Sequence, residues 1–142
     1  AICTARSTEP VVRTGQLAGI IAGVVRGEPG RHAATRSFQA IRIYINNELD
    51  ELEAALRAAV DALAVGGRLC VISFHSLEDR IVKRFMRDHS RVDPALRDVP
   101  VVPASALPVL KLPSRAVTAG EAELQQNPRA RSAVLRTAEK LR

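Results

Sequence analysis

The chain has 142 residues, the size of one ordinary domain, and 46% of them are hydrophobic. This composition excludes an intrinsically disordered protein, which would be poor in apolar residues and rich in charge. The 21 Lys and Arg exceed the 15 Asp and Glu, which gives a net charge of +6, and 18 of the 21 are Arg. The planar guanidinium suits phosphate groups, but GC-rich coding also favours Arg, so composition alone leaves nucleic-acid binding and coding bias equally open.

The sequence shows no sign of a membrane span or a metal site. Its longest apolar run, residues 17–25, has about half the length of a transmembrane helix. Cys3 and Cys70 lie far apart in the sequence, which favours a reduced, cytoplasmic protein. The three histidines show no metal-ligand spacing, and no CxxC motif is present: His32, His75 and His89. We therefore expect neither a membrane partner nor a bound metal.

The first part of the chain predicts short helices. Residues 1–7 resemble the end of a helix, and Thr14 predicts the N-cap of a second one. The apolar face of this second helix is expected to hold Leu17, Ile20, Ile21, Val24 and Val25. Glycine and proline between residues 27 and 30 end it.

The strongest helical pattern runs from Thr35 to Leu63, where apolar residues recur every three or four positions. Gly66 and Gly67 end this long helix. The apolar run that follows, residues 68–74, predicts a buried parallel strand.

A second helix is expected directly after this strand. Ser76 and Asp79 form a pattern like a capping box, and the helix extends to about Asp88. Residues 91–113 contain five prolines and predict a long surface connection that ends in a short strand near Leu110.

The last third predicts a helical turn near Thr118 and Glu121 and a final strand over residues 131–139. Helices that alternate with strands define an α/β fold. About three strands are too few for a complete doubly wound sheet, so we expect the second half of one. The chain begins with Ala1 and its only methionine is Met86, which agrees with a part of a larger protein.

Topology predicts where polar side chains gather. Ligands of α/β sheets bind at the carboxyl ends of parallel strands. Two blocks are expected at this edge, residues 32–37 and 75–76, and a third, residues 127–132, joins them if the last strand is antiparallel to its neighbour. Arginine recurs in these blocks, and helix N-termini add partial positive charge, so the edge favours phosphate contact. Alternation along an entering strand would place Arg129 and Arg131 on the same side.

A structural interpretation stays open for each block. His75 can satisfy a backbone group at the strand end, and Ser76 and Thr35 can act only as helix caps. The arginines can be ordinary solvated surface charges. No glycine-rich phosphate loop follows a strand, because Gly66 and Gly67 precede the strand at 68–74, so we expect no nucleotide-cofactor site within this chain.

Three long segments resemble the RsmH (MraW) family: residues 32–42, residues 66–85 with SFHSLEDR, and residues 127–133 with NPRARS. The resemblance extends over essentially the whole chain and is weakest over residues 91–107. Members of this family are S-adenosylmethionine-dependent methyltransferases that modify N4 of a cytosine in 16S ribosomal RNA of the small subunit. One departure is Ala33, where the family usually has proline.

The resemblance implies a class I (Rossmann-like) methyltransferase fold with an inserted helical domain. Residues 1–31 are then the end of the inserted domain, and residues 32–142 the C-terminal half of the methyltransferase domain. The S-adenosylmethionine site is expected upstream of this chain. The implied catalytic residues are His75, Ser76 and Asp79, and the implied RNA-binding residues are Arg36, Asn127, Arg129 and Arg131.

An alternative function belongs to a different class. Without the cofactor-binding half, the chain would be inactive alone and would act as a noncatalytic, basic RNA-binding or protein-interaction fragment. Such a fragment would leave an apolar sheet edge exposed and would pair with a second copy or with the missing N-terminal half.

Overall fold

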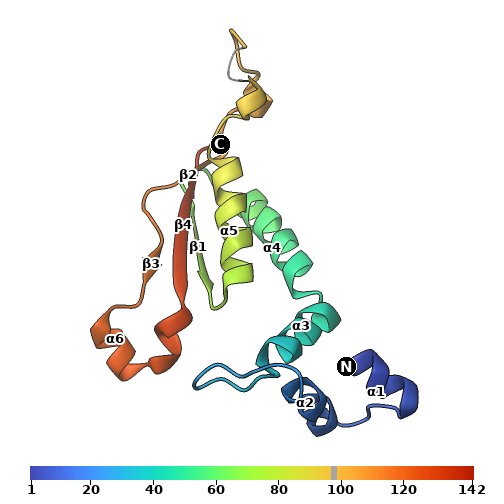
Figure 1. Ribbon diagram of the computed structural model, residues 1–142. Coiled ribbons are helices and arrows are strands. Elements are labelled where there is room, and N and C mark those ends of the chain that lie inside the picture. Colours follow the sequence, from blue (N-terminus) through green and yellow to red (C-terminus); the bar gives the residue numbers. More distant parts are fainter. Residues whose placement is uncertain (97–98) are drawn as a thin grey trace. The chain divides into compact units, whose positions relative to one another are not determined.

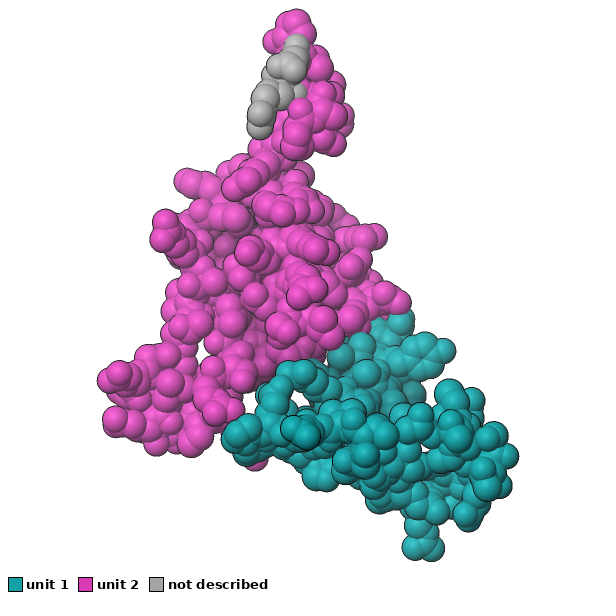
Figure 2. Space-filling model, viewed as in Figure 1, with its two compact units in different colours: residues 1–48 teal, residues 49–142 magenta. Residues whose placement is uncertain are grey.

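The computed structural model describes residues 1–96 and 99–142, so the predicted connection at 91–113 lies partly outside the described residues. The chain divides into two compact units, residues 1–48 and 49–142, which Figure 2 shows in teal and magenta. The predicted boundary after residue 31 concerns domains of the intact protein and stays a prediction. Each unit is described by itself.

Unit 1 is helical. Its helices are α1 (Ile2–Thr8), α2 (Thr14–Ala22) and α3 (Thr35–Asn46). The N-cap of α2 is Arg13 and not Thr14, because the Gln16 side chain accepts hydrogen bonds from the backbone N–H groups of Val12 and Arg13, both at 3.0 Å. Thr14 is therefore the first residue of the helix.

The prediction of one long helix over residues 35–63 is wrong, because this range contains two helices. Between α3 and α4 (Glu48–Ala62), Asn47 adopts a left-handed backbone conformation with φ of 51°. Asparagine tolerates this conformation better than most residues, and its N–H closes the last turn of α3 on the carbonyls of Ile43 and Tyr44. At the other end of α3 the N-cap is Ala34 and not Thr35, whose hydroxyl donates to the carbonyl of His32.

Unit 2 combines helices with a small sheet (Figure 1). Besides α4 it contains β1 (Arg68–Ser73), α5 (Ser76–His89), β2 (Leu110–Lys111), β3 (Val117–Thr118), α6 (Glu121–Gln126) and β4 (Val134–Lys140). Its described residues also form the short 3-10 helices η1 (Pro94–Leu96), η2 (Ala104–Ala106) and η3 (Pro128–Ser132). The α/β class, the helix after the first strand and the short strand at Leu110 are thereby confirmed.

The sheet is antiparallel among the described strands. Its order is β1-β4-β2, and β3 also pairs with β4. The predicted parallel direction of β1 is wrong for its partner in this chain, because β1 runs antiparallel to β4 from Arg68↔Glu139 to Ser73↔Val134. A short apolar run carries no information on strand direction. It is also only half-buried, since exposed residues alternate with more buried ones along β1.

The predicted final strand at 131–139 begins too early, because η3 occupies its first residues and β4 starts at Val134. Pro128 sits in the first turn of η3, where its missing N–H has no intrahelical partner to lose. The start of β4 therefore lies beyond both arginines of the NPRARS segment.

The core of unit 2 lies between α4, α5 and one face of the sheet. Its buried residues are Leu56, Val60, Val82, Phe85, Met86, Leu110 and Ala138. Val82 and Ala138 are fully buried, so α5 approaches β4 where the strand carries only a methyl group. Complete burial of a side chain such as Val82 or Met86 contributes roughly 1.5–3 kcal/mol. This packing fixes the start of α5 at the end of β1.

Candidate functional site

The register of β1 and β4 brings two of the three predicted blocks to one edge of the sheet. Ser73, the last residue of β1, pairs with Val134, the first residue of β4. The chain leaves β1 through His75 into α5 and enters β4 from η3 at this same edge. The antiparallel last strand on which the topological prediction depended is therefore present. We call the segments 74–79 and 127–133 together the polar edge.

His75 begins helix α5. Its backbone is extended, with φ of −141° and ψ of 159°, and its Nδ1 accepts a hydrogen bond from the N–H of Glu78 at 3.4 Å. The Glu78 carboxylate accepts in return from the N–H groups of Phe74 and His75, at 3.1 and 3.3 Å. The capping box is thus formed by His75 and Glu78, and the predicted pair of Ser76 and Asp79 is wrong by one residue.

The second nitrogen of His75 is the more unusual atom. Because Nδ1 accepts a hydrogen bond, the ring proton belongs on Nε2. Nε2 lies 3.1 Å from Glu78 Oε1, but it is a buried atom without a well-aligned hydrogen bond to any described residue. Burying an unsatisfied donor costs about 1–3 kcal/mol, and such groups in native proteins call for a functional or structural reason. His75 therefore carries a buried donor that the described residues do not satisfy with a well-aligned hydrogen bond.

Asp79 is held by an arginine that the sequence analysis did not single out. Its two carboxylate oxygens accept from Nε and Nη2 of Arg136 in β4, at 2.7 and 3.0 Å. Both side chains are mostly buried, with exposed fractions of 23% and 19%. The hydrogen bonds from Arg136 lower the pKa of Asp79, assisted by the charge of Lys83 and opposed by burial. Asp79 stays ionised and ties the first turn of α5 to the sheet.

The position of Arg136 in the sequence did contain a signal that it pairs with a carboxylate. It stands two residues before Ala138 on the same face of β4, the face that packs on α5. An arginine at an inward strand position needs a carboxylate partner. The sequence alone did not show which of the 15 acidic residues would provide it.

Three of the predicted RNA-binding residues lie in or next to η3: Asn127, Arg129 and Arg131. Asn127 accepts a hydrogen bond from the N–H of Arg129 through its side chain at 3.2 Å, so it caps the 3-10 helix. Arg129 and Arg131 are exposed, and neither forms an ion pair within the described part of the chain. Two residues apart on a helix with three residues per turn, they point about 120° apart. The prediction that strand alternation puts them on the same side is wrong.

Ser76 and Arg36 complete the candidate set. Ser76 is exposed at the first position of α5. Arg36 belongs to unit 1, where its guanidinium donates to Glu28 at 2.6 Å from a largely exposed position. An exposed pair of this kind is worth at most about 1 kcal/mol and is readily exchanged for another anion. That Arg36 shares an edge with unit 2 stays a prediction.

Three cavities stand out in the described residues, and none of them is lined by His75, Ser76 or Asp79. Within the same residues, no three His, Cys, Asp or Glu side chains are grouped as metal ligands. None of the helices described has the length and apolar character needed to cross a bilayer. None of these three cavities includes a residue of the polar edge.

The fold and the polar edge define an α/β protein with a candidate ligand edge where β1 leads into α5. The chain belongs to the MraW methylase family, whose model matches residues 1–141. It is 58% identical to the ribosomal RNA small subunit methyltransferase H of Xanthomonas oryzae pv. oryzae (strain KACC10331 / KXO85) over 142 residues, and 57% identical to that of Thiobacillus denitrificans (strain ATCC 25259 / T1) over 144 residues. These alignments cover 99% of this chain but only 42% and 46% of the relatives. The family predicted from the sequence segments is confirmed, and the chain spans less than half the length of these relatives.

Proposed function

We propose that this chain is the C-terminal portion of an S-adenosylmethionine-dependent methyltransferase that modifies N4 of a cytosine in 16S ribosomal RNA. The observation that carries the proposal is the Ser73↔Val134 register, which brings His75 and the arginines of η3 to one edge in a member of the MraW methylase family. The relatives' name, ribosomal RNA small subunit methyltransferase H, supports an RNA substrate.

The cofactor is held by residues outside this chain. No residue of the polar edge lines any of the three cavities described above, and the only paired glycines of the sequence, Gly66 and Gly67, precede β1 instead of following it. The residues present therefore do not fit S-adenosylmethionine on their own. We expect a class I, Rossmann-like sheet in the intact cytoplasmic protein, with residues 1–31 from the inserted helical domain and residues 32–142 from the methyltransferase domain.

The polar edge orients the base. A target cytosine must leave its helix before its exocyclic amine can be reached. Nε2 of His75 is buried beside Glu78 in the free chain, so this contact requires the Glu78 side chain to shift. Nε2–H then donates to a ring acceptor of the base, and the Ser76 hydroxyl accepts from the amine N–H, which directs the nitrogen lone pair. Asp79 acts as a positioning residue, because its ion pair with Arg136 fixes the first turn of α5 against β4. Such orientation lowers the activation barrier without a new covalent bond to the protein.

The arginines of the edge hold RNA phosphates. Arg129 and Arg131 diverge from η3, so they reach different phosphates, and Asn127 fixes the turn that carries them. We place Arg36 in the same role, with Glu28 as the anion that phosphate replaces.

Substitution of both η3 arginines tests this role. In Arg129→Ala/Arg131→Ala, RNA affinity should fall and the slope of log affinity against log salt should flatten by roughly 1.4–1.8, since each phosphate contact contributes about 0.7–0.9. The double variant Arg68→Ala/Arg84→Ala, which removes two exposed arginines elsewhere in unit 2, should change the slope by less than half as much. Equal slopes for the two double variants would remove Arg129 and Arg131 from the RNA contacts.

One observation favours the alternative of a noncatalytic interaction fragment. The sheet face opposite α5 exposes apolar side chains: Ile72 is 58%, Phe74 57% and Val117 53% exposed. Leu135 pairs with both Ile72 and Val117, so these groups are neighbours across three strands. Under this alternative the face pairs with a second copy or with the missing N-terminal half.

A chimera distinguishes the two functions. Residues 1–142 replace the matching segment of the Xanthomonas oryzae relative, and methyl transfer from labelled S-adenosylmethionine to small ribosomal subunits is measured. We expect transfer into RNA by the chimera and none by the isolated chain. A chimera that folds and binds the cofactor but leaves the RNA unlabelled contradicts the proposed function and favours the interaction fragment.

A further inference from the structure

We propose that a basic groove on unit 2, separate from the polar edge, binds the sugar–phosphate backbone of RNA. The groove lies between α5 and the segment that joins β2 to β3, elements that Figure 1 shows in unit 2. It deepens the proposed function and rests on the RNA substrate named there. It provides a second contact surface for the same RNA, away from His75.

The groove has a volume of about 570 Å³, and both cationic and apolar side chains line it. Lys83 and Arg87 stand one turn apart on α5, and Arg91 follows shortly after the helix end. Arg115, from the segment between β2 and β3, also lines the cavity. The buried Met86 and the partly exposed Leu112 are among its apolar lining residues. With Arg136 of β4, which also lines it, the groove therefore combines five cationic side chains with an apolar lining.

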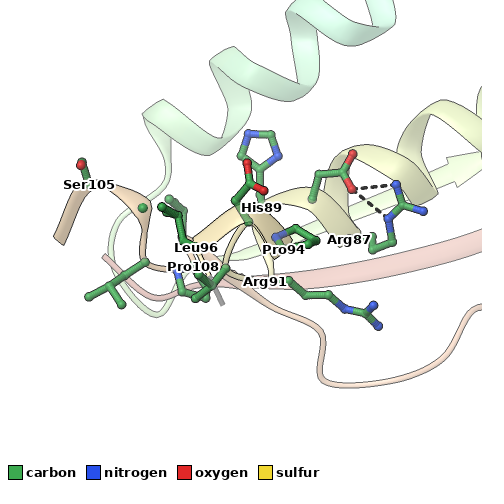
Figure 3. A pocket seen from close by; sticks show the side chains of 13 residues that line it. Arg87, His89, Arg91, Pro94, Leu96, Ser105 and Pro108 are labelled. Atoms are coloured by element: carbon green, nitrogen blue, oxygen red, sulfur yellow. Dashed lines mark hydrogen bonds and ion pairs between the residues drawn. The ribbon is translucent and has the colours of Figure 1, made fainter. Parts of the chain in front are cut away.

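The positive charge of the groove is largely uncompensated. Neither Asp nor Glu is among its lining residues. Arg87 forms an ion pair with Asp88, drawn as dashed lines in Figure 3. Asp88 is not among the residues that line the groove. Lys83, Arg91 and Arg115 are exposed and form no ion pair with any described residue. Three cations are thus available to a ligand.

The ion pair between Asp79 and Arg136 explains why the positive charge of Lys83 is not neutralised by Asp79. Arg136 also lines the groove, and its guanidinium neutralises Asp79, the carboxylate one turn before Lys83 on α5. Lys83 is near enough to lower the pKa of Asp79, but Arg136 is the main cause of that shift. Because Asp79 is already paired with Arg136, the ammonium group of Lys83 remains available to a ligand.

The chemistry of the groove favours RNA over an acidic peptide. Protein interfaces are anchored by Tyr, Trp and other large side chains, and the groove contains no aromatic residue. Arg and Lys along a channel with no base-reading amide or carboxylate are typical of backbone binding without sequence preference. An apolar lining lowers the local dielectric and strengthens each contact between Arg or Lys and phosphate.

A neighbouring cavity does not share these properties. It has a volume of about 750 Å³ and shares Arg87 and Arg91 with the groove. Figure 3 shows Arg91 extending away from Leu96 and Pro108, which form the other wall of that cavity. Asp88 and Asp93 also line it, so its cations face carboxylates. The proposal concerns the groove alone.

The test compares two triple variants of the full chain with equal loss of charge. Lys83→Gln/Arg91→Gln/Arg115→Gln removes the free cations of the groove. Arg68→Gln/Arg80→Gln/Arg84→Gln removes three exposed arginines that do not line it. Binding of a fluorescent short RNA duplex is measured between about 50 and 200 mM salt. Binding of a labelled poly-glutamate peptide is measured in parallel, and circular dichroism confirms that both variants are folded.

The groove variant should lose at least about tenfold in RNA affinity, and its salt slope should fall by roughly 2–3. The matched variant should lose less than about threefold. Equal losses in the two variants overturn the proposal, as does a loss of peptide binding with RNA binding intact. If the groove variant binds RNA like the wild type while the chimera still methylates RNA, the groove proposal fails and the proposed function stands. If the groove binds RNA but the chimera transfers no methyl group, the proposed function fails alone.

Discussion

His75 uses its two ring nitrogens for different purposes. Nδ1 serves the fold, because it accepts the hydrogen bond that starts α5. Nε2 serves no described residue well, although it is buried beside Glu78. A residue that is only a cap needs the first nitrogen alone. The second nitrogen is what connects His75 to the proposed base contact.

Substitutions at His75 distinguish its role as a helix cap from its proposed contact with the base. His75→Ala should reduce stability by about 0.5–1 kcal/mol, because the cap is lost, and His75→Asn should restore most of it, since asparagine is a favoured N-cap. In the chimera, both variants should slow methyl transfer on the order of 10–100-fold with cofactor binding unchanged. Urea unfolding and single-turnover transfer measure the two effects. Recovery of transfer in His75→Asn would mean that His75 acts only as a cap.

The ion pair of Asp79 and Arg136 predicts a pH-dependent stability. Because the folded pKa of Asp79 is lowered, its contribution is complete above the unfolded value of about 3.9 and is lost as pH falls through the folded pKa. Asp79→Asn should therefore cost about 1–2 kcal/mol at neutral pH, and its difference from the wild type should shrink below about pH 4. Urea midpoints across this range measure it.

Asp88→Asn is the matched control, because Asp88 is more exposed and pairs with the exposed Arg87. It should change stability by less than about 0.5 kcal/mol. If Asp79→Asn were as mild as this control at neutral pH, the pair would not hold α5 to β4.

At residue scale the sequence predicted the correct segment for the start of α5 but the wrong pair of capping residues. The SFHSLEDR run correctly indicated a capped helix after a strand, but the cap depends on whether His75 or Ser76 takes the extended backbone conformation. Ser is the more common N-cap, so propensity favoured the wrong residue. The contact between Asp79 and Arg136 joins positions 57 residues apart. Such a contact depends on the register of β4, which no local pattern contains.

At the scale of elements, α4 is secured by the last strand. Lys140 of β4 donates through Nζ to the carbonyls of Val60, Asp61 and Leu63, at 2.8, 3.3 and 2.7 Å. These groups lie at the C-terminal end of α4, where carbonyls lack helical partners and the helix dipole favours a cation. A single side chain thus connects the end of the helix to the sheet.

Lys140→Met keeps the aliphatic length and removes this cap, so it should destabilise the protein by about 1–2 kcal/mol. The control is Lys111→Met, which removes an exposed lysine from β2, and it should remain within about 0.5 kcal/mol of the wild type. Thermal and urea unfolding compare the two. Equal stability of the two variants would show that Lys140 contributes no cap.

Element types were more predictable than their boundaries. Helical periodicity continues from Ile45 to Leu49 although the backbone breaks at Asn47, because the apolar face resumes in phase after the break. The start of β4 was misplaced for a similar reason, since Arg131 and Ser132 have no side-chain feature that separates a 3-10 turn from a strand. Local backbone conformation decided both cases.

At the scale of the molecule, the family was recognisable from three sequence segments. The antiparallel last strand was only a condition of the topological argument, and the structure fulfils it. The basic groove was not predictable, because Lys83 and Arg91 meet Arg115 only after α5 has packed beside the segment between β2 and β3. Net charge left nucleic-acid binding and coding bias equally open, and it located no binding surface. The fold gathers part of the diffuse excess of arginine into the groove. In the polar edge, Arg129 and Arg131 are balanced in number by Glu78 and Asp79.

The central claim is that this chain supplies the base-contacting edge of an enzyme that methylates an exocyclic amine of RNA. The most direct measurement is mass spectrometry of nucleosides from small-subunit RNA after reaction with the chimera and labelled S-adenosylmethionine. We predict a single labelled product, N4-methylated cytidine, which forms on the order of 10–100-fold more slowly in the chimera that carries His75→Ala. Label on carbon 5 of cytidine, on another base or on ribosomal protein would contradict the account.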